Sequence, residues 1–396
     1  MAITVVGIGA DGWSGLDATQ RDAVNGADVV VGGERHLAML PEAVTAERRP
    51  WPSPLRDGLP ALLDELKGRR VVGLSSGDPL VAGIATILIE LGVEVTVLPA
   101  ISSVVLARAR MGWPAESVTV LRDHRDLPRH LAPENRVIVL SANADTPAQV
   151  ARLLTDSGFG GSTMSVFENL GGDEKRTDAD AESWHATVGN LNLIALDLWG
   201  DSPFASWTAG LPDHAFDHDG QLTKRDARAS ALARLAPAPD QMLWDVGAGA
   251  GSIGIEWLRA HPTCRAIAFE EREDRSKRIA ENAVRLGVGR LRVVTGHAPE
   301  AFGHFREPDA IFVGGGATDV GVLDRCWETL APGGRMVVHG VTLETERVLA
   351  DKYAELGGEL TRLHVEHAGP IGTFTGWKPA RAIVQWTVRK AAAQQK

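Results

Sequence analysis

The feature that most restricts the fold of this chain is a glycine-rich turn that directly follows the apolar run Met242–Val246. Gly247, Gly249, Gly251 and Gly254 lie within a short stretch, and an amphipathic segment comes after them. This pattern predicts a strand, a tight loop and a helix. Because glycines let a ligand approach the backbone closely, we expect a nucleotide-type site at the carboxyl end of this strand.

Short β-branched runs alternate with helix-like stretches along the chain, which predicts α/β folds with parallel strands. In the first half we expect strands at Ile3–Ile8, Asp28–Val31, Arg70–Leu74, Glu94–Leu98, Val118–Leu121, Arg136–Leu140, Thr163–Phe167 and Asn192–Asp197. In the second half we expect strands at Met242–Val246, Ala266–Phe269, Leu291–Thr295, Ala310–Val313, Arg335–His339, Glu359–His364 and Ala382–Val388. Helices are expected at Leu80–Leu91, Ser102–Met111 and Lys224–Leu235. The first two of these helices are followed by Gly92 and Gly112, which are suitable terminators.

Residues 200–221 interrupt this alternation with Gly, Pro, Asp and His and show no sustained periodicity. A chain of 396 residues is also too long for one ordinary core. We therefore expect two domains, at residues 1–205 and 210–396, and a frayed tail at Ala391–Lys396.

Composition excludes several classes of function. The formal net charge of −10 has the wrong sign for a protein that binds nucleic-acid backbones along its length. Cys264 and Cys326 cannot form a disulfide framework, and no His/Cys/Asp cluster has metal-ligand spacing. No leader precedes Ile3, and no apolar run reaches the roughly 18 residues of a membrane helix. We expect a soluble cytoplasmic protein without a bound metal, in which any contacts to an anionic substrate are local.

Two carboxylates beside the glycine turn help to choose between ligands. Asp245 stands two residues before Gly247, and Glu270 follows the strand Ala266–Phe269. A buried carboxylate at Asp245 would repel the pyrophosphate of a dinucleotide but attract the sulfonium and ammonium groups of S-adenosylmethionine. Glu270 could accept hydrogen bonds from the ribose hydroxyls. Because Gly249–Gly254 also fits the dinucleotide pattern G-x-G-x-x-G, an NAD(P)-dependent oxidoreductase remains an alternative, as does a methyltransferase with one degenerate domain.

Two later loops of the second half also follow strand ends. His297 and Ala298 lie where folds of this kind contact the adenine. Gly314, Gly315 and Gly316 follow another strand, and this floor without side chains suits a broad planar substrate. His297 and His339, both at strand ends, are the candidate proton donors.

The first half offers backbone donors at one sheet edge, as a site for a folded nucleoside would need. Asp78 is expected to cap a helix, with Pro79 in the first helical turn. The expected cofactor-binding residues are Gly7, Gly9, Gly77, Asp78, Pro79, Ser102 and Ser103.

Several motifs resemble those of known families. The second half resembles the decarboxylating precorrin methyltransferase domain of cobalamin biosynthesis in Leu211-Pro212-Asp213, Thr223-Lys224-Arg225, Leu243–Ser252, Ala298-Pro299-Glu300 and Phe312–Gly316. The first half resembles the tetrapyrrole methylases in Val6–Gly9, Gly32–Leu37, Ser75–Leu80 and Pro99–Ser103. The order of the two sets is similar to that in the fused precorrin-6Y C5,15-methyltransferases (decarboxylating).

This resemblance implies an N-terminal tetrapyrrole-methylase-type α/β domain and a C-terminal Rossmann-like class I methyltransferase domain, both using S-adenosylmethionine. It implies methylation of a precorrin-6 intermediate at C5 by the first half. It further implies C15 methylation and decarboxylation of the ring C acetate by the second half, which gives precorrin-8. The expected partners are an anionic tetrapyrrole and further copies of the chain, but neither nucleic acid nor a membrane.

A substrate with several carboxylates should meet cationic side chains near both clefts. The residues expected to bind it are Arg35, His36, Thr223, Lys224 and Arg228, with the backbone of Gly314, Gly315 and Gly316. Other candidates, equally well explained as surface charges, are Arg108, Arg110, Arg122, His124 and Arg125.

Overall fold

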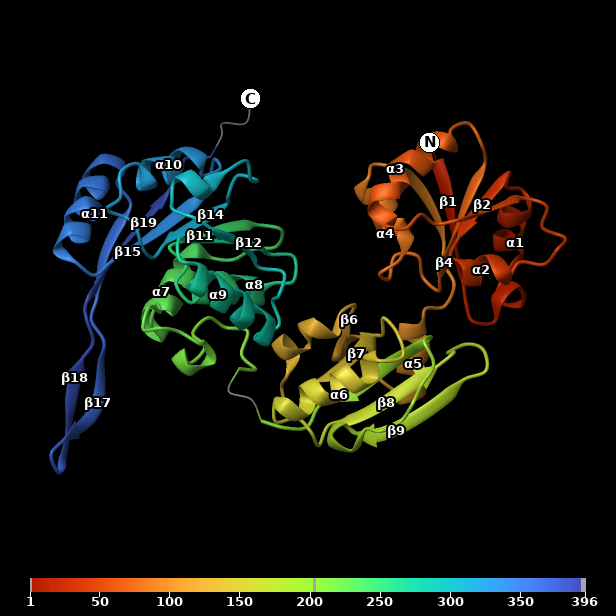
Figure 1. The fold of residues 1–396 in the computed structure, drawn as a ribbon, viewed down its shortest axis with the longest axis horizontal. Helices are drawn as coiled ribbons and strands as arrows, with labels where there is room; N and C mark the ends of the chain where they lie inside the picture. Colours follow the sequence, from red (N-terminus) through yellow and green to blue (C-terminus); the bar gives the residue numbers. More distant parts are fainter. Residues whose placement is uncertain (1, 202–203, 393–396) are drawn as a thin grey trace. The chain divides into compact units, whose positions relative to one another are not determined.

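The computed structural model describes residues 2–201 and 204–392, which form two compact units (Figure 1). The first unit contains the residues up to His124 and Ala132–Asp201. The second contains Arg125–Leu131 and, within the described chain, residues 204–392. This division differs from the expected domains because Arg125–Leu131, from the first half of the sequence, folds with the second unit. Of the tail expected to fray, residues 393–396 lie outside the described residues.

The first unit begins with a parallel sheet in the order β3-β2-β4-β1-β5. Its strands are β1 (Ala2–Ile8), β2 (Val29–Gly32), β3 (Glu47–Pro50), β4 (Val71–Ser76) and β5 (Glu94–Leu98). The associated helices are α1 (Ala18–Asn25), α2 (Glu34–Ala38), α3 (Leu55–Glu65) and α4 (Ile84–Glu90). The valine-rich central strands are buried on both faces, as in other parallel sheets that helices cover. The carboxyl ends of β1 and β4 therefore lie side by side at one edge.

Helix α4 is shorter than the sequence predicts. The expected helix over Leu80–Leu91, with Asp78 as its cap and Pro79 in its first turn, is wrong at its start, because α4 begins at Ile84. Asp78 instead closes a turn: its Oδ1 accepts a hydrogen bond from the backbone N–H of Leu80 at 2.9 Å. The preference of Asp for turns thus outweighs helix formation here.

A mixed sheet in the order β6-β7-β10-β8-β9 completes the first unit. Its strands are β6 (Val118–Leu121), β7 (Arg136–Leu140), β8 (Thr163–Glu168), β9 (Lys175–Asp180) and β10 (Asn192–Asp197). The helices of this part are α5 (Ser103–Met111) and α6 (Thr146–Asp156). Helix α5 ends at Gly112, whose φ of 68° is the left-handed conformation expected of a terminating glycine.

The second unit is built on a sheet in the order β13-β12-β11-β14-β15-β19-β16, in which the first five strands are parallel. Its strands are β11 (Met242–Val246), β12 (Arg265–Glu270), β13 (Arg292–Thr295), β14 (Ala310–Val313), β15 (Arg335–Gly340), β16 (Glu359–Leu363) and β19 (Ile383–Arg389). Its helices are α7 (Arg225–Leu235), α8 (Ser252–Ala260), α9 (Glu273–Arg285), α10 (Val322–Thr329) and α11 (Leu343–Leu356). The strand order reverses between β11 and β14, which is the point where ligands bind in open α/β sheets. The Rossmann-like class I arrangement predicted for this half is confirmed.

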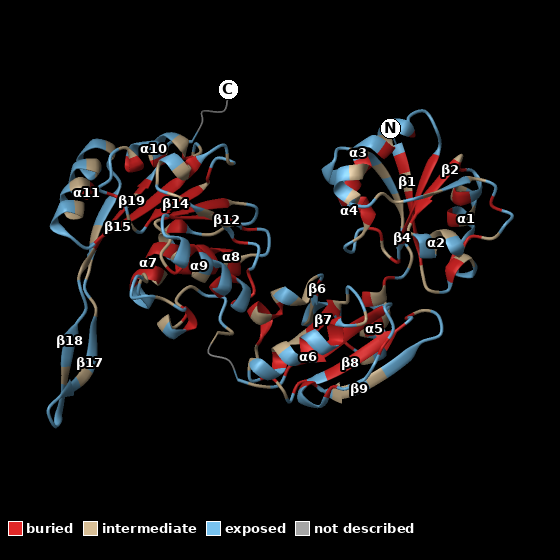
Figure 2. Cartoon of the chain, viewed as in Figure 1, coloured by how far each residue is buried: buried red, intermediate tan, exposed pale blue. Residues whose placement is uncertain are grey.

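A hairpin that the sequence analysis did not predict separates β16 from β19. Its strands are β17 (Glu366–Ile371) and β18 (Phe374–Pro379), and it extends away from the sheet of its unit (Figure 1). Figure 2 shows that its strands are largely exposed, whereas central strands of the larger sheets, such as β1 and β11, are buried. Exposed strands do not need the apolar alternation by which strands are recognised in a sequence.

No helix within residues 2–201 and 204–392 is long and apolar enough to span a lipid bilayer.

Candidate functional site

Asp245 is a buried carboxylate on the central strand of the second unit. Its neighbour Trp244 packs into the apolar core on the other face of the sheet, against Phe269 and Phe302. The alternation of side chains along β11 therefore directs Asp245 toward helix α8, where its Oδ2 accepts a hydrogen bond from the backbone N–H of Gly254 at 2.9 Å. Its Oδ1 is buried without a hydrogen-bond partner. Burial raises the pKa of Asp245 to about 7, so this position is suited to a ligand with positive charge.

The glycine turn after β11 brings two loops into direct contact. Gly247 has a φ of 66°, and a Cβ atom there would lie 2.7 Å from the backbone nitrogen of Gly315. A side chain at Gly247 would therefore push apart the loops that follow β11 and β14. Gly251 has a φ of 75° and forms the N-cap of α8. The glycines thus keep backbone exposed at the reversal point of the sheet.

Glu270 ends β12 beside the same turn and is 3% exposed. Its Oε2 accepts a hydrogen bond from the backbone N–H of Gly249 at 2.8 Å. Its Oε1 accepts one from the N–H of Arg272 at 3.3 Å. Ala298, which the sequence analysis placed near the adenine, is half-buried in the loop after β13. The two carboxylates and the glycine turn therefore meet at one edge of the sheet.

A cavity of about 790 Å³ opens beside the glycine turn. Its lining includes six residues of the predicted site, namely Thr223, Lys224, Gly247, Gly249, Gly314 and His339. Three further basic residues of the lining were not among the predicted site residues: Arg225 at the start of α7, His367 on β17 and Arg381 just after β18. Arg381 is exposed and forms no ion pair within the described part of the chain. The cavity thus combines a glycine floor with cationic side chains on its rim.

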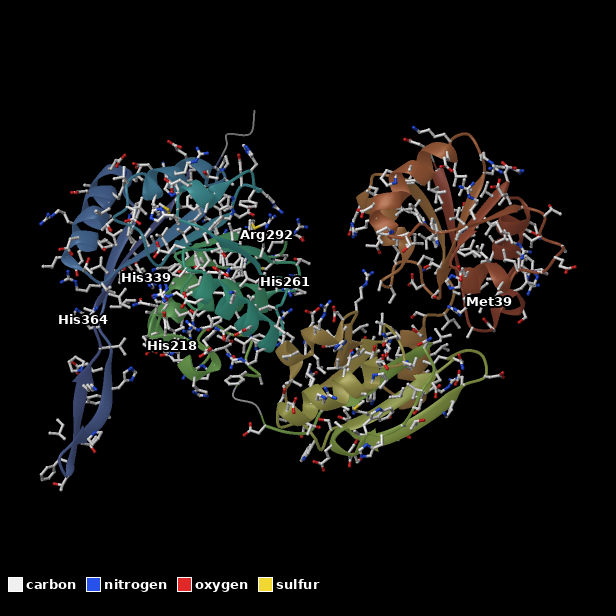
Figure 3. The ribbon with its side chains drawn as sticks, in the orientation of Figure 1. Met39, His218, His261, Arg292, His339 and His364 are labelled. Carbon is white, nitrogen blue, oxygen red and sulfur yellow. The ribbon has the colours of Figure 1, made fainter. Side chains whose placement is uncertain are left out.

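His339 reaches this cavity from the end of β15. It is 8% exposed, and its ring lies edge-on to Phe312 with the centroids 5.0 Å apart. Its Nε2 is 2.9 Å from Oε1 of Gln385 on the adjacent strand β19. Burial lowers the pKa of His339 to about 4, so the imidazole is neutral at physiological pH. In Figure 3 the residue lies where the hairpin leaves the sheet.

The first unit contains a second cleft, of about 400 Å³, between its two sheets. Six predicted site residues contribute to its lining: Gly9, Arg35, Gly77, Asp78, Ser102 and Ser103. Gly7 is packed against Gly77, so that a Cβ atom at Gly7 would overlap the carbonyl oxygen of Gly77. Pro79 is buried in the turn that follows Gly77 and Asp78. Ser102 caps α5, since its Oγ accepts a hydrogen bond from the N–H of Val105 at 3.3 Å. The loops after β1, β4 and β5 therefore meet at one sheet edge.

Arg35 and His36 lie at the rim of this cleft and share a hydroxyl partner. Nη2 of Arg35 and Nε2 of His36 are each 3.0 Å from Oγ of Ser76. Burial, together with the charge of Arg35, lowers the pKa of His36 to about 4. Arg122, from the group of candidates, also lines the cleft. The cleft thus has a positive charge at its entrance.

Comparison with known proteins covers both units. A model of the tetrapyrrole (corrin/porphyrin) methylases matches residues 2–182, and a model of the precorrin methyltransferase domain matches residues 214–390. A Mycobacterium tuberculosis protein named precorrin-6Y C(5,15)-methyltransferase [decarboxylating] is 45% identical over 98% of this chain and 100% of its own length. The chain belongs to the precorrin-6Y C5,15-methyltransferase (decarboxylating) family.

Two shorter relatives each match slightly less than half of this chain. One, from Pyrobaculum calidifontis, is named a probable cobalt-precorrin-6B C(15)-methyltransferase (decarboxylating) and is 31% identical over 44% of this chain and 91% of its own length. The other, from Salmonella typhimurium, is named a cobalt-precorrin-7 C(5)-methyltransferase and is 33% identical over 44% of this chain and 88% of its own length. Membership of this family gives no support to the oxidoreductase alternative.

Arg228 does not line the cavity, so its assignment as a substrate-binding residue is wrong. Its side chain is fully buried, and its Nε donates to Oε1 of Glu256 at 2.6 Å. Nη1 donates to Oδ1 of Asp213 and to the carbonyl oxygen of Thr223, and Nη2 donates to the carbonyl oxygen of Leu211. The guanidinium therefore fixes the loop before α7, and each of its three nitrogens is already hydrogen-bonded within the protein.

His297 is likewise outside the cavity lining. Its ring is exposed, with Nδ1 3.2 Å from Oε2 of Glu300 and Nε2 3.6 Å from Oδ2 of Asp319. The hydrogen bond with Glu300 raises its pKa. Of the two histidines that the sequence analysis considered, the structure brings only His339 to the cavity.

Two other cationic candidates have structural partners. Arg110 forms a two-point ion pair with Glu174, at 2.9 and 2.8 Å. Arg108 donates from Nε to the carbonyl oxygen of Trp113 at 3.2 Å. These contacts support the interpretation of both residues as ordinary surface charges.

Proposed function

We propose that this chain transfers methyl groups from S-adenosylmethionine to C5 and C15 of a precorrin-6 and removes the carboxyl group of the ring C acetate, which gives precorrin-8. The observation that carries the proposal for the second unit is the unpaired, buried Oδ1 of Asp245 at the rim of a glycine turn. Family membership over nearly the whole chain supports the same reaction for the protein as a whole.

The residues around the glycine turn fit this methyl donor. S-adenosylmethionine supplies a methyl group already activated on a sulfonium, so the protein mainly needs to bind, orient and desolvate the reactants. Asp245 would hold the positive end of the donor, and the free backbone of the turn would follow its chain. Glu270, at the tip of β12, would accept hydrogen bonds from the ribose. A dinucleotide would instead bring a pyrophosphate toward Asp245, which electrostatics disfavours.

The cavity next to the turn suits a large anionic macrocycle. Gly314, with Gly247 and Gly249, leaves a floor without side chains, on which a flat ring system could lie. Lys224 is half-exposed, and its Nζ is 3.6 Å from Oδ2 of Asp213, so it can turn toward a ligand. Lys224, His367 and Arg381 would bind the peripheral carboxylates of the substrate. In the first unit, Arg35 and Arg122 would do the same, and the neutral His36 beside Arg35 would contribute a hydrogen bond.

We assign C15 methylation and decarboxylation to the second unit and C5 methylation to the first. The two shorter relatives support two separable activities, because C(5) and C(15) methyltransferases occur by name as separate chains. The match of the precorrin methyltransferase domain to residues 214–390 and of the tetrapyrrole methylases to residues 2–182 supports the assignment to the two units. The second unit has the larger cavity, and it also has the buried carboxylate of Asp245 and the neutral imidazole of His339. We expect the decarboxylation to use these two groups.

Variants of the full-length chain, assayed with a precorrin-6 and S-adenosylmethionine, test this division by mass spectrometry. The unchanged protein should add two methyl groups and release one carbon dioxide. Asp245→Asn should stop C15 methylation and decarboxylation but leave C5 methylation, whereas Asp78→Ala should do the reverse. Asp351→Asn, at an exposed position of α11, is the matched control and should change neither. Loss of the same methyl group from both Asp245→Asn and Asp78→Ala would contradict the division, and loss from only one variant would indicate a degenerate domain.

A further inference from the structure

A polar pair lies inside the sheet of the second unit where an apolar core is expected. His339 on β15 and Gln385 on β19 are directly opposite each other in the antiparallel register, so their side chains share one face. Gln385 is completely buried, and its neighbours Val384 and Trp386 belong to the apolar core on the other face. Nε2 of His339 and Oε1 of Gln385 are 2.9 Å apart.

The burial of Gln385 has no evident structural purpose. Its Nε2 has no hydrogen-bond partner among the described residues, and leaving a buried amide donor unpaired costs free energy. The other end of the amide, Oε1, contacts the imidazole. An oxygen in this position requires the hydrogen of the neutral ring to be on Nε2, so that the lone pair is on Nδ1. Gln385 therefore fixes both the tautomer and the orientation of His339.

His339 lines the same cavity as the predicted cofactor loop. The same cavity is lined by Gly247, Gly249 and Gly314 and by His339 itself. The other imidazole of the lining, His367, is exposed and lies on the hairpin. His339 is thus the buried imidazole next to the floor on which a flat substrate would rest (Figure 3).

The two reactions assigned to this unit require opposite proton movements. When C15 is methylated, the bond from sulfur to the methyl carbon breaks, a bond from carbon to C15 forms, and the hydrogen on C15 leaves as a proton. When the acetate is decarboxylated, the bond to the carboxyl carbon breaks and its electron pair passes into the macrocycle. The carbon that remains then gains a proton and becomes a methyl group. One proton is therefore released and one is consumed, so no outside acid or base is needed for balance.

We propose that His339, positioned by Gln385, carries this proton from C15 to the carbon that loses carbon dioxide. The inference rests on the assignment of both reactions to the second unit. Nδ1 of the neutral ring accepts the proton that C15 gives up, and the resulting imidazolium returns it to the acetate carbon. Because burial keeps the imidazole a weak base, the ring gives the proton back readily. His339 is then the catalytic residue, and Gln385 is a positioning residue.

The first experiment follows the proton itself in the unchanged full-length protein. A precorrin-6 that carries deuterium at C15 is converted in ordinary water, and the new ring C methyl group is analysed by mass spectrometry and NMR. Part of the deuterium is expected in that methyl group. If the recovered substrate keeps its label but the methyl group contains none, the transfer is overturned.

The second experiment uses variants of the pair. His339→Gln should slow the release of carbon dioxide by about 100-fold or more, the usual contribution of a general acid or base, with unchanged C5 methylation and S-adenosylhomocysteine binding. His304→Gln, at an exposed position, is the matched control. Gln385→Leu should lower kcat without raising KM, and Gln385→Glu, which keeps an acceptor oxygen at the same length, should restore most of the activity.

The possible failures can be told apart. If Asp245→Asn still methylates C15 and decarboxylates, the proposed function of the second unit fails. If Asp245→Asn loses both reactions while His339→Gln keeps both at the rate of the unchanged protein, only the role of His339 is overturned. Equal kcat in Gln385→Leu and the unchanged protein would overturn the positioning role of Gln385.

Discussion

Asp245→Asn should stabilise the protein in the absence of ligand while removing its affinity for the cofactor. Burial raises the pKa of Asp245 from 3.8 to about 7 in the folded chain. One pH unit corresponds to about 1.4 kcal/mol, so holding this carboxylate ionised costs about 4 kcal/mol relative to the unfolded chain. The asparagine avoids that cost but places an unpaired N–H₂ group at the site of Oδ1, which costs about 1–2 kcal/mol. The expected net gain at pH 8 is about 2–3 kcal/mol in the free energy of unfolding.

The pH dependence of this gain follows from the raised pKa. Below pH 3.8 the carboxyl group of Asp245 is protonated in both the folded and the unfolded chain, and its contribution to stability is fully present. As the pH rises toward about 7, only the unfolded chain ionises, so this contribution is progressively lost. Above about pH 7 both states are ionised and the loss is constant. The stability difference between the variant and the unchanged protein should therefore grow up to pH 7 and then level off.

Urea unfolding at several pH values measures this difference, and titration calorimetry with S-adenosylhomocysteine measures the binding. The ligand's ammonium group favours the ionised carboxylate, so the affinity of the unchanged protein should rise with pH up to about 7. The variant should show neither this rise nor measurable binding in the second unit, whereas the control Asp351→Asn should resemble the unchanged protein. If the free energies of unfolding of the variant and the unchanged protein varied with pH in parallel, this would refute the interpretation of Asp245 as a desolvated carboxylate that binds a cation.

Three further changes have defined expectations. Arg228→Met should lower the free energy of unfolding by about 3–5 kcal/mol, because it leaves the buried Glu256 without its cationic partner. Urea unfolding measures this loss, and a loss smaller than that caused by replacing an exposed arginine would contradict the prediction. Arg381→Ser should raise KM for the tetrapyrrole with little change in S-adenosylhomocysteine affinity, and steady-state kinetics that show an unchanged KM would exclude a substrate contact. Gly7→Ala should abolish C5 methylation, because its Cβ would overlap the carbonyl oxygen of Gly77; mass spectrometry of the product would count against this if both methyl groups were still added.

The sequence predicts the elements of this fold where strands are buried and fails where they are exposed. Strands such as β2 and β14 are continuous apolar runs, because helices cover both faces of their sheets. By contrast, β3 reads Glu-Arg-Arg-Pro, and β9 alternates charged with small residues at a sheet edge. The hairpin of β17 and β18 has no covered face at all. Such segments lack the apolar pattern on which prediction depends.

In the candidate site, features built from residues adjacent in the sequence could be predicted, whereas contacts between residues far apart in the sequence could not. The glycine turn and Asp245 could be predicted because strand, loop and acid are adjacent in the sequence. The role of Arg228 could not, since its main partner Glu256 lies on another helix. Arg381 and Gln385 were not predicted because the hairpin separates them in the sequence from the residues that they approach in the fold. These are the other residues of the cavity lining for Arg381 and His339 for Gln385. Only the three-dimensional pairing of β15 with β19 reveals that Gln385 faces His339.

The segment Arg125–Leu131 affects any attempt to separate the two units of this protein, because it belongs to the second unit. Nε of Arg129, within that segment, donates to the carbonyl oxygen of Arg259 at 2.9 Å, and Trp207 donates from its indole to the carbonyl oxygen of Arg129 at 3.1 Å. Because the residues on both sides of this segment belong to the first unit, a single cut near residue 201 would leave Arg129 and its two hydrogen bonds behind. A fragment that starts after the cut would lack an interior piece and expose the surface which that piece covers. In a fragment that carries the second unit alone, water would have to take the place of Arg129 at the carbonyl oxygen of Arg259 and at the indole of Trp207.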